Sequence, residues 1–383
     1  MRIWLRGAMV LTVVLMLAGC PTEPPSGTGG PGTGTGTATG TGGATGVASG
    51  TAVEALPALP PAPPIPTVPL GNEAPPAPDK NPMTAEKVEL GHNLWFDTRL
   101  SGDGTMSCAT CHPAEGWLAD GKAISVGVGG KPAKRHTPSM LNKAHDPLLY
   151  WDGRADKGLE GQALAPIKGF LAADVAKVVA ALQAVPGYRA LFKAAYGDET
   201  VTDERIAFAI ASYERTLLSG NSPWDRWQKN GDTGAVSEDA KKGWELFRGK
   251  AACGSCHAGF GLTDGKFHNT GIGMDKVGTP AYDGGRADIT KSPDGTRVAA
   301  DEGAFKTPSL RDVARTSPYF HDGSVETLTD AVRLMAGGGK ANPNLDKELK
   351  DHKLTDAEVK QLVAFLASLN SDVKLPAAPD LPK

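Results

Sequence analysis

The sequence predicts a mostly α-helical protein that contains two domains of the same kind. About three hundred residues follow the low-complexity N-terminal part of the 383-residue chain, which is more than one ordinary domain. Each half of this region carries one Cys-x-x-Cys-His motif, and its apolar residues recur mainly with helical spacing. A Gly/Asn/Asp-rich stretch at 229–234 is typical of a junction. We therefore expect domains over 81–233 and 234–383.

Four stretches show the helical pattern most clearly. They are 85–95 before the first motif, 203–217, 237–247 before the second motif, and a C-terminal helix. The C-terminal helix begins with a capping box of Thr355 and Glu358. Two of these helices have a well-defined apolar stripe, formed by Ile206, Ile210, Tyr213 and Leu217 in one and by Val359, Leu362, Val363, Leu366 and Leu369 in the other.

The two cysteine motifs have the pattern of covalent haem attachment: Cys108-Ala-Thr-Cys111-His112 and Cys253-Gly-Ser-Cys256-His257. In such a motif the two thiols bond the porphyrin vinyl groups, and the adjacent histidine binds the iron. A redox dithiol and a zinc site are the alternatives. A zinc pair, however, usually places its two halves about 15–20 residues apart. The sequence therefore predicts two covalently bound haem c groups in two cytochrome c-like domains packed together.

The N-terminus resembles a lipoprotein signal peptide over residues 1–20. Basic residues precede an apolar run over 8–18, which is too short to span a bilayer and is followed by Gly-Cys20. Cleavage before Cys20 would leave that cysteine to carry lipid, which predicts a periplasm-facing or cell-envelope lipoprotein. Pro21 stands where an aspartate often favours inner-membrane retention, so the outer membrane is the expected location. With four cysteines in the haem motifs and Cys20 lipidated, none of the five remains for a disulfide.

Residues 21–80 are predicted to form a disordered tether. This segment is Gly/Thr-rich and then Pro/Ala-rich, with few large side chains whose burial could offset the entropy of ordering it. It would hold the haem domains off a membrane surface, although a passive spacer is an equal alternative. The net charge of −3 argues against nucleic acid as a partner.

Five blocks around the motifs carry a family resemblance. They are Leu94-Trp-Phe-Asp-Thr-Arg-Leu-Ser, Ser107-Cys-Ala-Thr-Cys-His, Trp151-Asp-Gly-Arg-Ala, Phe305-Lys-Thr-Pro-Ser-Leu-Arg and Pro318-Tyr-Phe-His-Asp-Gly-Ser. With these blocks, the region from about 90 to 369 resembles the bacterial di-haem cytochrome c peroxidases and their MauG-like relatives. The resemblance implies reduction of hydrogen peroxide to water at the N-terminal haem. Electrons would enter at the C-terminal haem from a small cytochrome c or copper protein, and a homodimer is one expected state.

Two other functions stay open at this point. One is a MauG-like oxidase that acts on a protein or organic substrate, and the other is an electron-transfer cytochrome without enzymatic activity. The first haem's pocket separates them, because an open iron favours an enzyme and a second histidine on the iron favours a carrier.

The resemblance also implies roles for single residues. Met335, fourteen residues after His321, lies where the family has the axial methionine of the second haem. MauG has a tyrosine there, so Met335 favours the peroxidase branch; packing in a helix core is the alternative. Trp151 would lie between the two haems as an electron relay. The alternative for it is a packed tryptophan whose neighbours Asp152 and Arg154 form an ion pair.

The predicted peroxide pocket both matches the family and departs from it. Gln162 resembles the active-site glutamine, whereas the glutamate expected some ten residues later is missing. Glu160 and Asp174 are possible substitutes. Asp174, however, directly precedes the apolar stretch 175–182 and is more simply a helix N-cap.

Further departures concern the ligands of the first iron and of a calcium ion. Val128 occupies the place of a displaceable distal histidine, so the first haem would be five-coordinate unless His136 or His145 binds it. The family binds an interdomain calcium, for which Thr316 and Pro318 would supply carbonyl oxygens. His136 stands where an asparagine usually supplies another oxygen, and imidazole is a poor ligand for this hard cation. Calcium is therefore a possible second cofactor.

Overall fold

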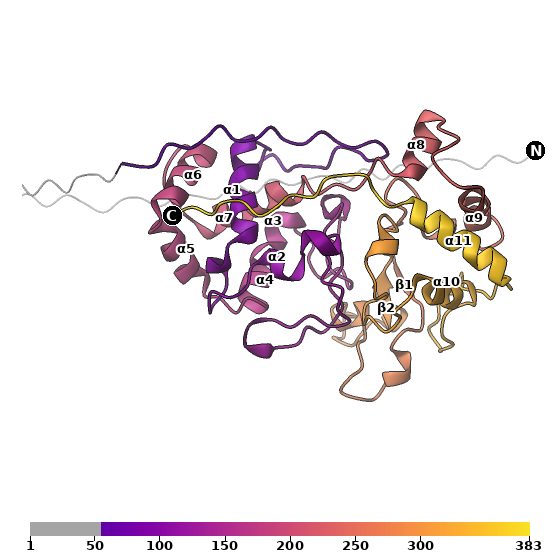
Figure 1. The fold of residues 1–383 in the computed structure, drawn as a ribbon. Coiled ribbons are helices and arrows are strands. Elements are labelled where there is room, and N and C mark those ends of the chain that lie inside the picture. Colours follow the sequence, from indigo (N-terminus) through magenta and orange to yellow (C-terminus); the bar gives the residue numbers. More distant parts are fainter. Residues whose placement is uncertain (1–54) are drawn as a thin grey trace, which may run out of the picture. The chain divides into compact units, whose positions relative to one another are not determined.

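The computed structural model describes residues 55–383. The predicted signal peptide, Cys20 and the first part of the predicted tether lie outside the described residues. The described chain is mostly helical and forms two domains, with α1 to α7 in the first and α8 to α11 in the second (Figure 1). The predicted fold class is thus confirmed. None of the helices in this described part is both long and apolar enough to cross a membrane.

The first domain is built around the crossing of its first and last helices. Its helices are α1 (Ala85–Phe96), α2 (Cys108–Cys111), α3 (Gly158–Gln162), α4 (Leu164–Gly169), α5 (Val175–Gln183), α6 (Pro186–Tyr196) and α7 (Asp203–Glu214). A Cβ at Gly91 of α1 would lie 2.0 Å from the carbonyl oxygen of Ala209, so only glycine permits this approach of α1 to α7. Helix α7 ends at Glu214, earlier than predicted, because Leu217 N–H bonds the Glu214 carbonyl in a tighter turn.

The second domain repeats this arrangement with other helices. They are α8 (Pro223–Asn230), α9 (Glu238–Arg248), α10 (Leu328–Ala336) and α11 (Asp356–Ser368). The predicted capping box of Thr355 and Glu358 is present at the start of α11. A Cβ at Gly243 of α9 would lie 2.0 Å from the Gln361 carbonyl oxygen, so glycine again permits two helices to cross closely. Although α8 precedes the predicted junction, its Trp224 belongs to the core of the second domain.

Short segments complete the two domains. Strands β1 (Phe267–Asn269) and β2 (Ala304–Lys306) pair antiparallel in the second domain, with Phe267 opposite Lys306. The 3-10 turns are η1 (Thr98–Leu100), η2 (Ala114–Gly116), η3 (Val128–Gly130), η4 (Lys143–His145), η5 (Cys253–Ser255), η6 (Met274–Lys276), η7 (Arg286–Asp288), η8 (Ala299–Asp301) and η9 (Val313–Arg315).

Polar contacts join the two domains. Arg135 of the first domain donates from Nε and Nη2 to both carboxylate oxygens of Asp283 in the second, at 2.7 and 2.8 Å. Asp283 lies in the segment between β1 and β2. The buried Lys306 of β2 donates to the Leu148 carbonyl at 2.7 Å and pairs with Asp146. These contacts hold the second domain against the loops that follow the first haem motif.

The last part of the predicted tether is in contact with both domains. The carbonyl of Gly71 accepts from Arg311 Nη2 at 2.6 Å, and that of Pro76 accepts from Arg215 Nε at 2.8 Å. An extended Pro-rich chain leaves its backbone carbonyls free, so buried arginines can bind it. The predicted tether boundary at residue 80 therefore falls too late.

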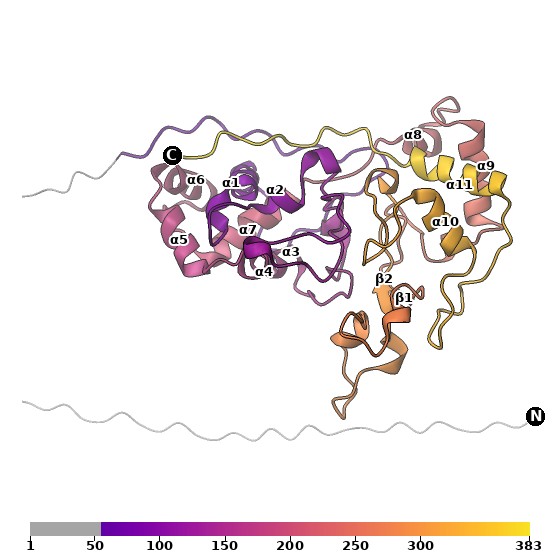
Figure 2. The same cartoon turned by 60° about the horizontal axis from the view of Figure 1, so that its bottom comes forward.

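The C-terminal segment after α11 returns to the first domain (Figure 2). The Ala377 carbonyl oxygen lies 2.8 Å from His92 Nε2 of α1, and the Lys383 carbonyl accepts from Gly187 N of α6 at 3.2 Å. Leu375 packs against the core of that domain. The C-terminal end of the described chain thus binds the surface of the first domain.

Candidate functional site

The two motif histidines have the same local geometry. His112 Nδ1 lies 2.8 Å from the carbonyl oxygen of Leu118, and His257 Nδ1 lies 2.9 Å from that of Leu262. A ring that donates from Nδ1 to a carbonyl keeps Nε2 free as a metal ligand. Burial lowers the pKa of both imidazoles, which favours the neutral form that binds iron. In both predicted proximal ligands, the ring is therefore held by a carbonyl at Nδ1 and leaves Nε2 free to bind iron.

A serine bonds the carbonyl that precedes each of these two carbonyls in the chain. Ser139 Oγ donates to the Trp117 carbonyl at 2.7 Å, and Ser309 Oγ donates to the Gly261 carbonyl at the same distance. Each serine ends a Thr-Pro-Ser triplet that follows the haem motif of its own domain. This internal repeat was visible in the sequence and would have predicted the support of both histidines.

A cavity lies beside the first motif, with about 1450 Å³ of empty space including its open mouth. Cys108, Cys111 and His112 line it together with mostly apolar and aromatic side chains. Cations are also present in its wall, among them Lys143 and Arg154. An apolar wall with a few charged groups suits a porphyrin, whose ring is apolar and whose propionates are anionic. The residues present therefore fit a haem.

The four motif cysteines are free thiols in the structure, without disulfides. Burial raises the pKa of the Cys108 thiol, and it raises that of Cys253 to about 11. These thiols are thus neutral, inert side chains until they are joined to a porphyrin.

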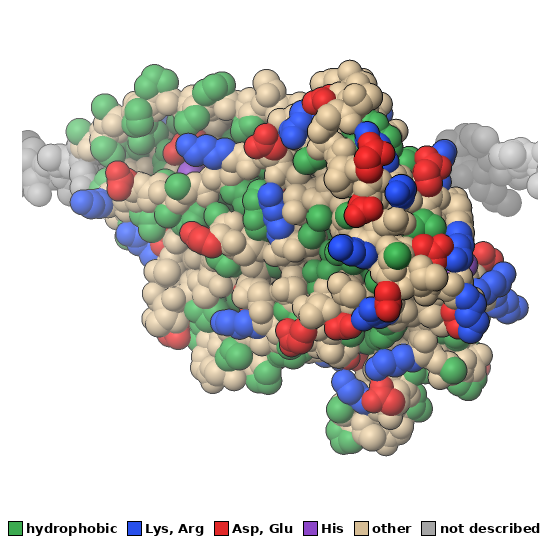
Figure 3. Space-filling view, turned by 45° about the vertical axis from the view of Figure 1, so that its right-hand side comes forward, with side chains coloured by type: hydrophobic (Ala, Val, Ile, Leu, Met, Phe, Trp, Pro, Cys, Tyr) green, Lys and Arg blue, Asp and Glu red, His purple; other side chains and the backbone are tan. Residues whose placement is uncertain are grey.

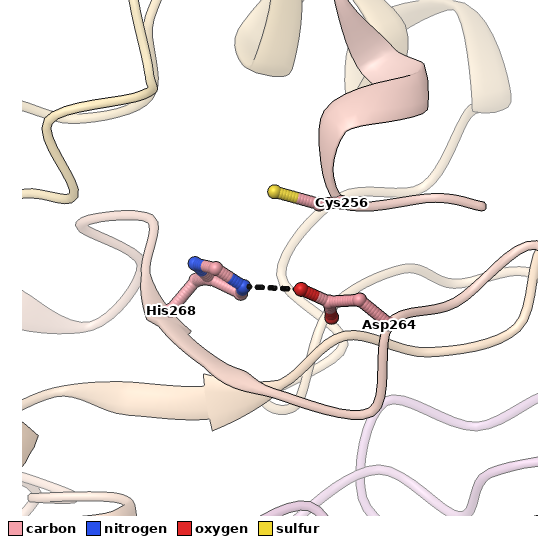
Figure 4. Close-up of side chains that lie close together, drawn as sticks. All are labelled: Cys256, Asp264 and His268. Atoms are coloured by element: carbon pink, nitrogen blue, oxygen red, sulfur yellow. Dashed lines mark hydrogen bonds and ion pairs between the residues drawn. The ribbon is translucent and has the colours of Figure 1, made fainter.

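The second motif lies beside a cluster that has the composition of a metal site. The ligand atoms of Cys256, Asp264 and His268 lie within 4.8 Å of one another (Figure 4). His268 is already bound from both sides, with Nε2 3.2 Å from Asp264 and Nδ1 2.6 Å from Asp346. Cys256 would bond the second haem, which leaves no thiolate for another metal. We therefore assign this cluster to the surroundings of the second haem.

Gln162, the predicted active-site glutamine, lines the cavity of the first motif from the end of α3. Its Nε2 donates to the hydroxyl of Tyr150 at 3.0 Å. The guanidinium of Arg154 lies over the Tyr150 ring, 3.9 Å from its centroid. Tyr150 and Arg154 also line the cavity, so the three residues form a polar part of its wall.

The two substitutes considered for the missing glutamate act elsewhere. Glu160 uses both carboxylate oxygens to bind Arg215, at 2.7 and 2.9 Å, so the idea that it replaces the glutamate is wrong. Asp174 is exposed and accepts from Ala176 N at 2.9 Å, which makes it the N-cap of α5. The alternative that Asp174 is simply a helix cap is confirmed.

Trp151 lines the same cavity at the contact between the two domains. Its Nε1 donates to the His136 carbonyl at 2.9 Å, and its own carbonyl accepts from Lys306 N of β2 at 2.8 Å. The predicted ion pair of its neighbours is also present, with Arg154 Nη1 2.9 Å from Asp152. The indole is therefore held by a hydrogen bond within the first domain, and the backbone of Trp151 is bonded to the second domain.

The three residues considered for the distal ligand differ in position. Val128 lies in η3, whose loop is bonded to the end of α4 through Val128 N and the Phe170 carbonyl at 2.9 Å. His136 is buried, lines the cavity and places Nδ1 2.7 Å from the Lys122 carbonyl. His145 instead packs edge-on against Phe260 of the second domain, with 4.7 Å between the ring centroids. Of the two candidate histidines, His136 is the one in the cavity wall.

The remaining predicted ligands lie in the second domain. Met335 is in the last turn of α10 and is half-buried. Leu328 and Val332 of the same helix pack against the core of the second domain, whereas Met335 is not among the residues of that core or packed against it. Thr316 and Pro318 lie in the loop after η9.

Sequence reasoning missed Tyr150 and Glu214 as parts of the cavity wall. Glu214 is the last residue of α7 and is buried in the cavity wall. The helical period gave a signal, because Glu214 follows Ile210 of the predicted apolar stripe by one turn. A carboxyl group on the buried stripe of a helix is a candidate functional group.

The chain is similar to several known proteins. A family model described as di-haem cytochrome c peroxidase matches residues 85–233, and one described as cytochrome c matches 240–370. The methylamine utilization protein MauG of Methylorubrum extorquens is 42% identical over 314 residues, which cover 81% of this chain and 85% of that protein. Cytochrome-c peroxidase IdrP1 of Denitromonas iodatirespirans is 37% identical over 332 residues, which cover 79% of this chain and 88% of that protein. A solved structure of a MauG-like protein associated with microbial copper homeostasis has a TM-score of 0.71 at 32% identity and covers 80% of this chain and 95% of that chain.

Proposed function

The chain belongs to the di-haem cytochrome c peroxidase family, and we propose that it reduces hydrogen peroxide to water with electrons from a small redox protein. As a member of this family it is an oxidoreductase with two c-type haems. The observation that carries the proposal is the cavity beside His112, which is lined by Gln162 and Tyr150.

The chain's own residues would hold and serve the two haems. Cys108 and Cys111 would bond the first porphyrin, and His112 would bind its iron. The second haem would be bonded by Cys253 and Cys256 and ligated by His257 and Met335. When bound, these groups supply irons that react with peroxide and exchange electrons. Within the first cavity, the amide of Gln162 and the hydroxyl of Tyr150 are placed to bind a small polar molecule.

We propose that electrons enter at the second domain and reach the first through Trp151. Support comes from the position of Trp151, which is bonded to His136 in the first domain and to Lys306 in the second. Trp151→Phe should slow electron transfer between the haems, measured after rapid reduction of the second haem, while both haems stay bound. Trp227→Phe, in α8 of the second domain, is the control. An unchanged rate in the Trp151 variant would remove Trp151 from the path.

The proposed function is tested by peroxide-dependent oxidation of a reduced small cytochrome. The lipid-free, fully haem-loaded protein is assayed in the oxidised state and again after half-reduction. Saturable turnover supports a peroxidase, and equal activity without pre-reduction indicates a first iron that is already open. Absence of turnover in both states, with haems that still exchange electrons, would indicate the carrier or the MauG-like alternative.

Gln162→Ala should slow the reaction with peroxide by roughly 10²-fold, the usual cost of removing one positioned hydrogen-bond donor from an active site. Haem content should stay the same, because Gln162 bonds Tyr150 and not His112, whose Nδ1 is bonded to Leu118. Stopped-flow absorption after mixing with peroxide measures the rate. Gln228→Ala, on an exposed part of α8, is the matched control. Equal rates in the two variants would exclude a role for Gln162.

A MauG-like oxidase that acts on a protein or organic substrate is the second candidate. It is favoured by the 42% identity to a protein named MauG. Met335 speaks for the peroxidase, since MauG is expected to have tyrosine at this place. The two functions differ in their reductant, because only the peroxidase oxidises a reduced cytochrome in proportion to peroxide.

Location and partners complete the proposal. We propose a cell-envelope lipoprotein anchored through Cys20, facing the periplasm and more simply placed at the outer membrane. The donor would be a small cytochrome c or copper protein. Basic and acidic side chains are interspersed on the face shown in Figure 3, which agrees with the small net charge and gives no single-sign surface there. A homodimer remains part of the proposal, to be tested by its mass in solution.

We propose that a calcium ion binds between the domains with fewer protein ligands than in the family. Within the described chain, the carbonyl oxygens of Thr316 and Pro318 accept no hydrogen bond, so both are free to bind a cation. His136 contributes no oxygen, and its Nδ1 is engaged with Lys122. Calcium would therefore bind weakly, and equilibrium dialysis of the haem-loaded protein would measure it.

A further inference from the structure

Glu214 is a buried acid in the wall of the first cavity. It is 3% exposed and lines the cavity together with Tyr150 and Gln162. Its Oε2 has no hydrogen-bond partner among the described residues. Leaving such an oxygen buried and unpaired is costly, most of all when the group is ionised. Glu214 lines the cavity and its Oε2 has no protein partner, which indicates that this oxygen acts on a molecule in the cavity.

Burial of Glu214 favours its protonated form. Burial raises its pKa to about 8, which Arg215 opposes and Glu160 reinforces. Arg215 is largely neutralised by its two hydrogen bonds to Glu160. Five titratable groups interact electrostatically with Glu214. They are Tyr213 of α7, Arg215 directly after α7, Cys108 of α2, Glu160 of α3 and Tyr150 in the loop before α3.

We propose that Glu214 is the group that holds a proton for peroxide reduction and so takes the role of the missing family glutamate. This inference rests on the proposed peroxidase function. In the overall reaction the O–O bond of peroxide breaks, two electrons and two protons are taken up, and two water molecules form. The electrons come from two molecules of the reduced one-electron donor. The Glu214 carboxyl gives one proton to an oxygen of peroxide, becomes a carboxylate, and is reprotonated from solvent.

The position of Glu214 suits this role better than those of the other acids near the first haem. Glu160 is bound by Arg215, and Asp174 is an exposed helix cap. Tyr150 lines the same cavity, and its hydroxyl oxygen accepts a hydrogen bond from the Gln162 amide, which leaves the hydroxyl hydrogen free to donate. Glu214 and Tyr150 thus line the same cavity, and the charge of Glu214 acts on the Tyr150 hydroxyl.

The test compares Glu214→Gln with Glu204→Gln, a control at the exposed start of the same helix. The first readout is the midpoint potential of the first haem as a function of pH. Reduction of the iron disfavours a nearby carboxylate, so the wild-type potential should fall as pH rises around 8, and this dependence should be lost in Glu214→Gln alone. The second readout is the rate with peroxide, which should drop by roughly 10²-fold or more in that variant.

An infrared titration of the wild-type protein gives a third, independent readout. A carbonyl stretch of a protonated carboxylic acid should persist at pH 7 and disappear above the pKa of Glu214. Its absence at pH 7 would overturn the inference even if the Gln variant failed to bind haem. If wild type reduces peroxide and Glu214→Gln does so at the same rate and with the same pH dependence, the inference alone is overturned. If wild type does not reduce peroxide, the proposed function fails, and the role of Glu214 falls with it.

Discussion

Replacement of Met335 by histidine is expected to lower the midpoint potential of the second haem by a few hundred millivolts, within the roughly 0.8 V that axial ligands control. A thioether stabilises ferrous iron and raises the potential, whereas a second imidazole stabilises ferric iron more. Met335 is half-buried at the end of α10 and lies outside the core that its helix neighbours fill. Redox titration followed by absorption measures the change.

A lower potential should also slow the proposed reaction. The second haem would no longer take electrons readily from a donor, so peroxide turnover should fall while the first haem's own reaction with peroxide stays the same. Leu334→His, one residue earlier in α10, controls for a histidine on this helix. An unchanged potential in Met335→His, or an equal shift in both variants, would remove Met335 as a ligand.

The parts of the site fixed by short sequence spacing were predicted well. Both cysteine motifs, the capping box at Thr355 and the helix cap at Asp174 depend on residues within a few positions of one another. Such local geometry is set before any tertiary contact forms. The spacing of a motif is therefore a strong signal, and the comparisons confirm the family that it indicated.

The parts fixed by tertiary contacts could not be predicted from the sequence. Glu160 was a candidate acid until the structure showed Arg215, 55 positions away, binding both of its oxygens. Glu214 became a candidate only because the packing of α7 buries its carboxyl in the cavity wall. The Pro-rich stretch near Gly71 was assigned to a tether from its composition alone. Composition gives no sign that Arg311, 240 positions away, binds the Gly71 carbonyl. In each case the deciding partner is distant in the chain.

That same arginine, Arg311, forms a deeply buried ion pair. Its guanidinium binds both oxygens of Asp225 at 2.9 Å, and the two side chains are 1% and 0% exposed. Arg311 Nε also donates to the Phe260 carbonyl at 2.6 Å, and Nη2 donates to the Gly71 carbonyl. One side chain thus joins α8, the second haem's loop and the N-terminal segment.

Arg311→Met should therefore lower the free energy of unfolding by about 3–5 kcal/mol, because it leaves the Asp225 carboxylate buried without its partner. Arg248→Met removes an arginine that pairs with Glu245 on an exposed face of α9, and it should cost far less, since exposed ion pairs contribute little. Denaturant unfolding of the haem-loaded variants, followed by circular dichroism, measures both. The double variant Arg311→Met with Asp225→Leu should recover part of the loss, because the unpaired charge is gone. Equal losses in the two single variants would show that burial gives this pair no special weight. No recovery in the double variant would place the loss in the Phe260 and Gly71 contacts of Arg311 or in the cap that Asp225 forms with Ser222 at the start of α8.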